Sequence, residues 1–303
     1  MEDILSDILR LIRLKGCVYF VRDFWSPWAM QMEGGAVAQF HVVLRGQCVI
    51  ESKGRKWIGA PGDVFLFPRG QTHTIADEQY RTAVRGQDFM QSLETNDPLF
   101  AEGEELTQLI CGHYEYRTNT GHPLIEELPA VIHIKSFESY SPETINSVLP
   151  ALIRELKNDR PGAAVVVEKL AEIFLVQVLR AHYEQGKSAE GFLAAMFDKR
   201  LTRALRMIHS NYREGLTLDD LAAAAGMSRS AFALQFKSTM GVAPVAYLAN
   251  WRMCQANDIL QLGDVTLSQV ADRVGYQSDV SFSRAFKRQF GKSPSAVRQQ
   301  AIS

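Results

Sequence analysis

Hydrophobic and polar residues follow a strand-like pattern in the first half of this chain. Between residues 17 and 136, short runs of β-branched and aromatic residues are separated by Gly, Pro and Asp, which predicts strands joined by turns. The runs are CVYFVRDF, FHVVLRGQCVIES, KWIGA, DVFLFP and AVIHIKSF. Regular short strands of this kind are typical of a barrel or a sandwich. Residues 76–108 interrupt the pattern and are predicted to form a long, partly helical loop.

Helical spacing replaces this pattern from residue 141 onward. Ser141 and Pro142 suit the N-cap and first position of a helix that runs to about Lys157. Pro161 opens a second helix, with apolar residues at helical spacing to about Tyr183. The polar stretch EQGKSAEG predicts an interdomain linker, after which helix resumes over about residues 192–212. The apolar faces of these helices are expected to form core or scaffold, and they would also serve as a dimer interface.

The C-terminal part of the chain contains one pattern of apolar, Gly, Ser and Pro positions twice. The offset between the copies is 49 residues up to the glycine and 50 after it, so the second turn is one residue longer. The first copy runs Leu218, Leu221, Ala222, Gly226, Ser228, Phe232, Phe236, Lys237, Gly241, Pro244, and the second Leu267, Val270, Ala271, Gly275, Ser278, Phe282, Phe286, Lys287, Gly291, Pro294. Each copy predicts two short helices joined at the glycine, the helix-turn-helix arrangement.

Capping signals support both copies. Thr217 to Asp220 and Thr266 to Gln269 read as capping boxes that open the first helix of each pair. A glycine then makes each turn and a serine caps the second helix. The phenylalanine pair of each copy is expected to point inward because its members are four residues apart. A helix over residues 244–262, ending at Gly263, would hold the two copies at a fixed separation.

Composition is that of a globular protein of about two domains, with 303 residues, 46% hydrophobic and 22% charged. No apolar run approaches the roughly 18 to 20 residues of a membrane span, and the charged N-terminal stretch MEDILSDILRLIRLKG lacks a signal-cleavage pattern. The four cysteines are scattered, which favours a reducing, cytoplasmic setting over a disulfide framework.

The charge is unevenly divided along the chain. From residue 193 to the end there are 14 Lys and Arg against 8 Asp and Glu, a net charge of +6, whereas the preceding residues carry −7. A basic C-terminal part attached to an acidic remainder is typical of a nucleic-acid-binding module fused to another module.

These C-terminal features, together with YLANWRMCQANDIL between the copies and VADRVGYQSDVSFSRAFKRQFGKSPSAVR at the end, resemble the AraC/XylS-type bacterial transcription regulators. The resemblance covers about residues 197–298. It implies two recognition helices in successive major grooves on one face of DNA, roughly 34 Å apart.

The resemblance also implies which side chains face DNA. The base-facing positions are Ser230, Ala233 and Leu234 in the first copy and Asp279, Val280, Ser281, Ser283 and Arg284 in the second, while Lys237 and Lys287 are expected on phosphates. The family often has arginine where this chain has Leu234, so the first helix offers an apolar surface suited to thymine methyls. Arg284 keeps the capacity for a bidentate guanine contact.

The segment GDVFLFPRGQTH, residues 62–73, resembles the second signature of the cupin barrel. This resemblance implies that His73 begins a strand facing the barrel interior. The first signature is vestigial, because His41 and Gly46 stand there without the usual His-x-His and glutamate. Together with CVYFVRDFWSPWAM, LICGHYEY and LIEELPAVIHI, the segment looks like the cupin-sensing branch of the AraC-type regulators.

Cupin enzymes supply three or four His and Glu ligands to one metal. Here His41 and His73 are the candidates for contact with an effector or a zinc-like ion, and His113 and His122 are weaker candidates. The alternative is that the first two histidines only form hydrogen bonds inside a barrel that binds no metal, so metal binding stays open.

Cys17 and Cys111 belong to the pattern of the same branch, some of whose members respond to oxidants. A thiol switch at these two positions is therefore one hypothesis. The alternative is that they are inert core residues, as strand cysteines usually are.

The sequence predicts an α+β protein: a cupin-like β-barrel sensing domain over residues 1–136, a helical dimerisation or linker segment over 137–190, and an all-α DNA-binding domain with two helix-turn-helix units over 191–303. The leading hypothesis is a transcription regulator, not an enzyme and without a cofactor. Its expected partners are double-stranded DNA, a small-molecule effector or oxidant, RNA polymerase and a second copy. The alternatives are a cupin metalloenzyme with an attached DNA-binding domain, and a helical adaptor that binds protein.

Overall fold

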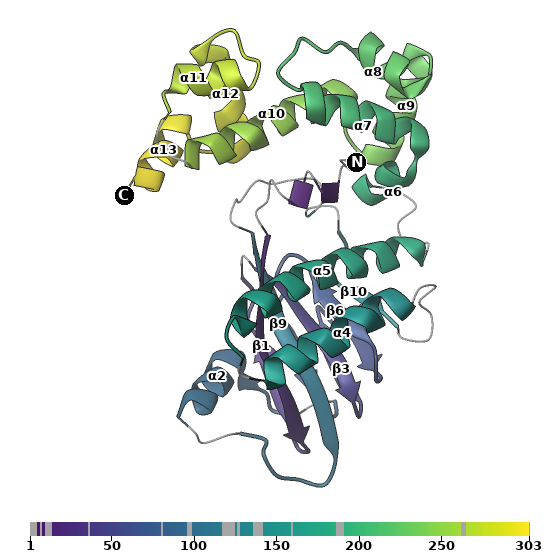
Figure 1. Cartoon of the computed structure of the whole chain (residues 1–303), viewed down its shortest axis with the longest axis vertical. Coiled ribbons are helices and arrows are strands. Elements are labelled where there is room, and N and C mark those ends of the chain that lie inside the picture. The colour runs from purple at the N-terminus through teal and green to yellow at the C-terminus, as the bar shows by residue number, and fades with distance from the viewer. Residues whose placement is uncertain are drawn as a thin grey trace. The chain divides into compact units, whose positions relative to one another are not determined.

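The computed structural model divides the chain into two compact units, which are described separately (Figure 1). Leu14–Tyr116 and Leu128–Lys187 form the first, here called the sheet unit. Met1–Arg13, Arg117–Glu127 and Ser188–Ser303 form the second, here called the helical unit. The structure describes residues 5–6, 8–9, 14–35, 37–79, 81–95, 99–116, 125, 128–135, 142–158, 160–185, 191–261 and 265–302. Within these ranges no helix is long and apolar enough to cross a membrane.

Two five-stranded sheets form the body of the sheet unit. The first has the order β1 (Leu14–Trp25), β9 (Leu106–Tyr116), β3 (Ala38–Arg45), β6 (Val64–Phe67), β10 (Ile132–Ile134). The second has the order β5 (Arg55–Gly59), β4 (Cys48–Ser52), β7 (His73–Ala76), β2 (Ala29–Met32), β8 (Val84–Arg85). The strand pairs are antiparallel except β2 with β8.

The main core of this unit draws residues from both sheets, which therefore face each other. Val43, Phe65 and Leu109 from the first sheet join Ile50 and Ile75 from the second in one buried cluster. Helix α2 (Gly86–Glu94) adds its one fully buried aromatic ring to the same cluster. Side chains alternate between the two faces of a strand, so the apolar alternation of these strands supplies this core directly.

Two long helices, α4 (Pro142–Lys157) and α5 (Ala163–Glu184), belong to the sheet unit and pack on the first sheet (Figure 1). Phe40 and Phe174 place their ring centroids 5.8 Å apart, and the Tyr114 hydroxyl donates to the carbonyl of Ala171 at 3.0 Å. A Cβ at Gly16 would lie 2.6 Å from the Ala171 Cβ, so a glycine lets α5 approach β1. The first sheet is therefore covered on both faces, which explains why the first six residues of β3 are all buried.

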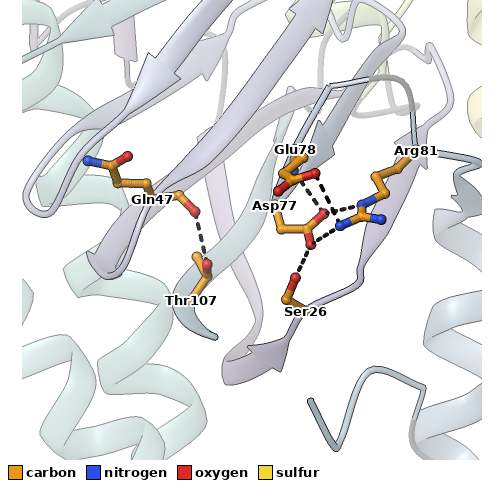
Figure 2. Close-up of polar contacts among 6 residues, drawn as sticks. All are labelled: Ser26, Gln47, Asp77, Glu78, Arg81 and Thr107. Carbon is orange, nitrogen blue, oxygen red and sulfur yellow. Dashed lines mark hydrogen bonds and ion pairs between the residues drawn. The ribbon is translucent and has the colours of Figure 1, made fainter. Parts of the chain in front are cut away.

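A polar cluster fastens the turn between β1 and β2 (Figure 2). Asp77 accepts hydrogen bonds from the Ser26 hydroxyl and from Arg81, whose Nε lies 3.1 Å from Oδ1. Burial tends to raise the pKa of Asp77. The pKa is nevertheless below its ordinary value, because the carboxylate accepts these hydrogen bonds and the N–H of Glu78 and lies beside the positive charge of Arg81. Thr107 fixes a neighbouring loop by donating to the Gln47 carbonyl at 2.9 Å (Figure 2).

The helical unit contains α6 (Phe192–Phe197), α7 (Lys199–Asn211), α8 (Leu218–Ala225), α9 (Arg229–Met240), α10 (Pro244–Gln261), α11 (Leu267–Arg273), α12 (Asp279–Phe290) and α13 (Pro294–Ile302). The long helix α10 contacts the helices α8 and α9, which precede it in the sequence. It also contacts α11, α12 and α13, which follow it. It therefore connects the two halves of this unit.

The α+β prediction and most predicted elements are confirmed. The prediction of one continuous helix over residues 192–212 is wrong, because this segment forms two helices, α6 and α7. Asp198 causes the break: its side chain accepts the N–H groups of Arg200 and Leu201 and so caps a new helix. The strands β2 and β9 lie outside the predicted runs and β8 lies within the predicted loop, whereas β7 begins at His73 as expected. Most of the N-terminal amphipathic stretch, Ser141, Gly263 and the centre of the expected linker, residues 186–190, lie outside the described residues.

Candidate nucleic-acid interface and buried sensor core

Local hydrogen bonds build the first helix-turn-helix as the sequence predicts. The capping box of α8 is complete: Thr217 N–H donates to Asp220 Oδ2 at 2.8 Å and Asp220 N–H donates to Thr217 Oγ1 at 3.3 Å. Gly226 ends α8 in the left-handed region at φ +68°, where glycine is favoured. Ser228 Oγ then accepts the N–H of Ala231 and starts α9. These contacts fix the angle between the two helices.

The second helix-turn-helix repeats this construction. Thr266 N–H donates to Gln269 Oε1 at 3.0 Å and Gln269 N–H donates to Thr266 Oγ1 at 3.2 Å. Gly275 adopts φ +78°, and a Cβ there would lie 2.4 Å from the carbonyl oxygen of Arg213. This turn therefore requires glycine both for its backbone conformation and for its close approach to the loop before α8.

The second helix of each pair has a buried face and an open face. Phe232, Phe236, Phe282 and Phe286 are fully buried, as predicted. Of the ten predicted DNA-contacting side chains, eight are exposed and two, Ala233 and Ser283, are half-buried. Leu234 is 73% exposed and Val280 62% exposed, so both apolar side chains are available for contact.

Two of these ten side chains, Ser281 and Arg284, differ in whether they already form hydrogen bonds within the protein. The Ser281 hydroxyl lies 3.0 Å from Ser278 Oγ and donates to the Ser278 carbonyl at 2.9 Å, so it belongs to the cap of α12. Arg284 is exposed and makes no hydrogen bond or ion pair within the described residues. Arg284 is therefore the better placed of the two to contact a base.

Residues behind the open faces hold the helices, and the sequence patterns did not single them out. Arg252 on α10 donates to the carbonyls of Tyr212 and Glu214, both at 2.6 Å, and burial lowers its pKa. Gln235 on α9 donates to Asp198 at 2.8 Å and ties α9 to the start of α7. Both helices contain several other polar side chains, so no sequence pattern distinguishes these two residues.

In the sheet unit, the predicted residues His41, His73 and Cys111 form one buried chain. His41 Nδ1 lies 3.0 Å from Cys111 Sγ, and His41 Nε2 lies 2.7 Å from His73 Nε2. His73 Nδ1 lies 2.8 Å from the carbonyl oxygen of Gln71. The strands β3, β7 and β9 carry the three side chains, so long-range pairing brings them together.

The chain has a single consistent proton arrangement. The Gln71 carbonyl can only accept, so His73 carries its proton on Nδ1 and offers Nε2 as an acceptor. His41 then donates from Nε2, and its free Nδ1 accepts the Cys111 S–H. Burial lowers the pKa of His73 to about 4 and that of His41 well below 6.5, and it raises the pKa of the Cys111 thiol well above its ordinary value. All three groups are neutral at neutral pH.

The other predicted candidates lie apart from this chain. His113 stacks on Tyr19 and lies 3.3 Å from Glu115, and His122 lies outside the described residues. Cys17 is half-buried, and burial followed by the charge of Glu115 raises the pKa of its thiol. In the described part of the chain, no three His, Cys, Asp or Glu side chains are grouped as metal ligands would be.

Family models match both units. A cupin model matches residues 3–184, and a helix-turn-helix domain model matches residues 221–300. A putative AraC-like transcription regulator of Streptomyces lividans is 31% identical over 98% of both chains. This chain belongs to the AraC-like transcription regulators.

Other regulators are similar to this chain. The transcriptional regulator AlkR of Acinetobacter baylyi is 29% identical to the present chain. The match covers 99% of this chain and 100% of AlkR. A crystal structure of an AraC-type transcriptional regulator from Chromobacterium violaceum is 29% identical over 34% of this chain and 93% of its own, with a TM-score of 0.33. The chain is a DNA-binding regulator with a cupin-type N-terminal domain, and the open faces of α9 and α12 are its candidate DNA interface.

Proposed function

We propose that α9 and α12 each read base pairs in successive major grooves of one DNA site. The observation that carries this proposal is the exposure of Leu234, Val280 and Arg284 on two helices whose opposite faces are buried. Leu234 and Val280 suit thymine methyls, and Arg284 suits a guanine edge. The exposed Lys237 and Lys287 suit phosphates, which supply affinity without reading sequence.

Selection of binding sites from random duplexes tests this proposal. The full-length protein should enrich two half-sites whose centres are about one helical turn apart. Leu234→Asp should abolish the preference in one half-site and leave the other unchanged, because a carboxylate repels phosphate and gives up the methyl contact. Enrichment of a single short motif, or no enrichment, contradicts the proposal.

The sheet unit is proposed to sense a small molecule, with His41 and His73 in the wall of the sensing core. A ligand there changes DNA affinity only if it binds two conformations of the protein unequally. A small molecule is favoured over an oxidant because both candidate thiols, Cys17 and Cys111, have raised pKa values, and the thiolate is the reactive form. Cys17→Ser and Cys111→Ser variants should respond to inducing conditions as the parent does, and loss of response in either would favour the thiol switch.

The remaining proposals concern activity and assembly. We infer that the protein is not an enzyme and acts as a homodimer that contacts RNA polymerase. The relatives named above support the first point, since their names describe regulators. Stoichiometric iron or manganese together with turnover of a small substrate would favour the cupin metalloenzyme instead.

A further inference from the structure

A cavity of about 530 Å³ lies within the sheet unit, beside the chain of Cys111, His41 and His73. Its volume is within the range of about 300 to 1,000 Å³ that is typical of small-molecule sites. Its apolar wall comes from β1, β2 and α2 and consists of Tyr19, Phe20, Met30, Met32, Phe89 and Met90. Methionine and aromatic side chains together adapt to varied apolar ligands.

One buried polar atom in the wall has no hydrogen-bond partner. Gln39, on β3, lines the cavity and is 6% exposed. Its Nε2 donates to the carbonyl of Glu33 at 3.2 Å, which fixes the orientation of the amide. Its Oε1 accepts no hydrogen bond within the described residues. A buried carbonyl oxygen without a donor is unfavourable, so a ligand that brings an N–H or O–H group would remove this penalty.

Charge in the lining has one sign. Glu33 and Glu94 line the cavity, and its described lining includes no Lys, Arg or His. The nearby cation Arg85 is held by Asp88 through two hydrogen bonds of 2.9 Å. Glu33 provides both the backbone carbonyl bound by Gln39 and one of the two carboxylates of the lining.

We propose that this cavity binds an apolar amine in its protonated form, with the ammonium donating to Gln39 Oε1 beside Glu33 and the apolar body against the methionines and aromatic rings. This inference rests on the proposed sensing function of the sheet unit and names its ligand class. The aromatic rings of Tyr19 and Phe20 add attraction for a cation, whereas the Phe89 ring already has the Arg22 guanidinium 5.9 Å from its centroid. A carboxylate ligand would meet an acceptor and two like charges, so the cavity discriminates against fatty or aromatic acids.

The test compares three probes with one apolar body: naphthylmethylamine, naphthylmethanol and naphthoate. Their affinities for the full-length protein are measured by calorimetry at neutral pH and low salt. Naphthylmethylamine should bind at least about tenfold more tightly than naphthoate, with naphthylmethanol between them. The naphthylmethyl trimethylammonium ion, which carries charge without an N–H donor, should bind more weakly than the amine.

Variants locate the effect in the cavity. Glu33→Gln and Glu94→Gln, both at exposed positions, should each weaken the amine about threefold and leave the alcohol unchanged. Glu104→Gln, at an exposed glutamate outside the lining, is the matched control and should change nothing. Gln39→Leu should weaken both the amine and the alcohol.

Three outcomes overturn the inference: naphthoate binding as tightly as the amine, no binding by any probe, or unchanged amine affinity in both glutamate variants. Binding to DNA selected from random duplexes is measured on the same preparations. If DNA binding persists while the probe ranking fails, the ligand class is wrong and the regulator function stands. If DNA selection fails while the amine ranking holds, the proposed DNA readout is wrong and the cavity assignment stands.

Discussion

At the scale of single residues, Arg284 and Lys287 should separate base reading from backbone binding. Both are exposed on α12, three residues apart. Arg284→Ala should reduce discrimination at one base pair of the second half-site by about 1–3 kcal/mol, because a bidentate guanine contact is lost. The measurement is competition between duplexes that differ only at that base pair.

Lys287→Ala is the matched control for this variant. It should weaken binding to all duplexes alike. The slope of log affinity against log salt concentration should become smaller in magnitude by about one. Unchanged discrimination in Arg284→Ala would remove Arg284 from the set of base-reading residues.

The buried histidine pair predicts a pH dependence of stability. Unfolded histidine titrates near pH 6.5, whereas burial lowers the pKa of His73 to about 4 and that of His41 further below its ordinary value. The unfolded state therefore binds more protons between these limits, and the free energy of unfolding should fall as pH falls from about 6.5 to 4. Above pH 7 this contribution is constant.

The double variant His41→Leu/His73→Leu tests this dependence. It removes both imidazoles together, so no histidine is left facing an apolar side chain, although the Cys111 thiol and the Gln71 carbonyl lose the partners that the histidines supplied. Urea unfolding at several pH values should give a flatter profile between pH 6.5 and 4 than the parent has. Identical profiles for the two proteins would show that the histidines do not carry the dependence.

At the scale of elements, the two helix-turn-helix glycines should differ in what they tolerate. Gly226 and Gly275 both have positive φ, so alanine costs about 1–2 kcal/mol of strain at either position. A Cβ at Gly226 meets only the Arg203 side chain at 3.6 Å, whereas at Gly275 it would overlap the Arg213 carbonyl at 2.4 Å. Gly275→Ala should therefore lower the urea midpoint clearly more than Gly226→Ala. Equal losses would contradict the close packing of the second turn.

Sequence patterns predict best the elements whose signals are local. The capping boxes at Thr217 and Thr266 and the turn glycine Gly226 depend on contacts within a few residues, and the structure has all of them. The break at Asp198 was missed because an aspartate between two apolar helical stretches also fits a continuous exposed face. The four-residue strand β2 is too short to give a clear alternation of its own.

The candidate sites show the same division. The exposed positions on α9 and α12 followed from helical spacing and family resemblance. The buried chain was predicted only as separate residues, because the 70 residues between His41 and Cys111 are bridged by the pairing of β3 with β9. The free acceptor of Gln39 depends on side-chain geometry in that same pairing, which no local pattern encodes.

At the scale of the whole molecule, charge is divided between the C-terminal part of the chain and the residues before it. Residues from 193 onward carry a net charge of +6 and the preceding residues −7. DNA therefore attracts the C-terminal part and repels the remainder. A ligand in the sheet unit must then act by shifting a conformational equilibrium, and a second copy of the chain provides one such equilibrium.

We propose that helix α5 offers the surface for a second copy. Val166 and Ile173 are seven residues apart, so they lie on one side of the helix, and they are 41% and 46% exposed. A two-fold symmetric pairing would bury this stripe against its own copy. Val166→Glu/Ile173→Glu should therefore shift the protein from dimer to monomer in sedimentation equilibrium, because it buries like charges against each other.

The same variant should weaken binding to paired operator sites and keep the parent's affinity for a single site, since each copy retains both helix-turn-helix units. Ile58→Glu is the matched control, because it introduces the same charge at another exposed apolar position, on β5. The control should sediment as the parent does. A dimer that survives both substitutions in α5 would exclude this stripe as the interface, and equal losses in the variant and the control would attribute the effect to charge alone.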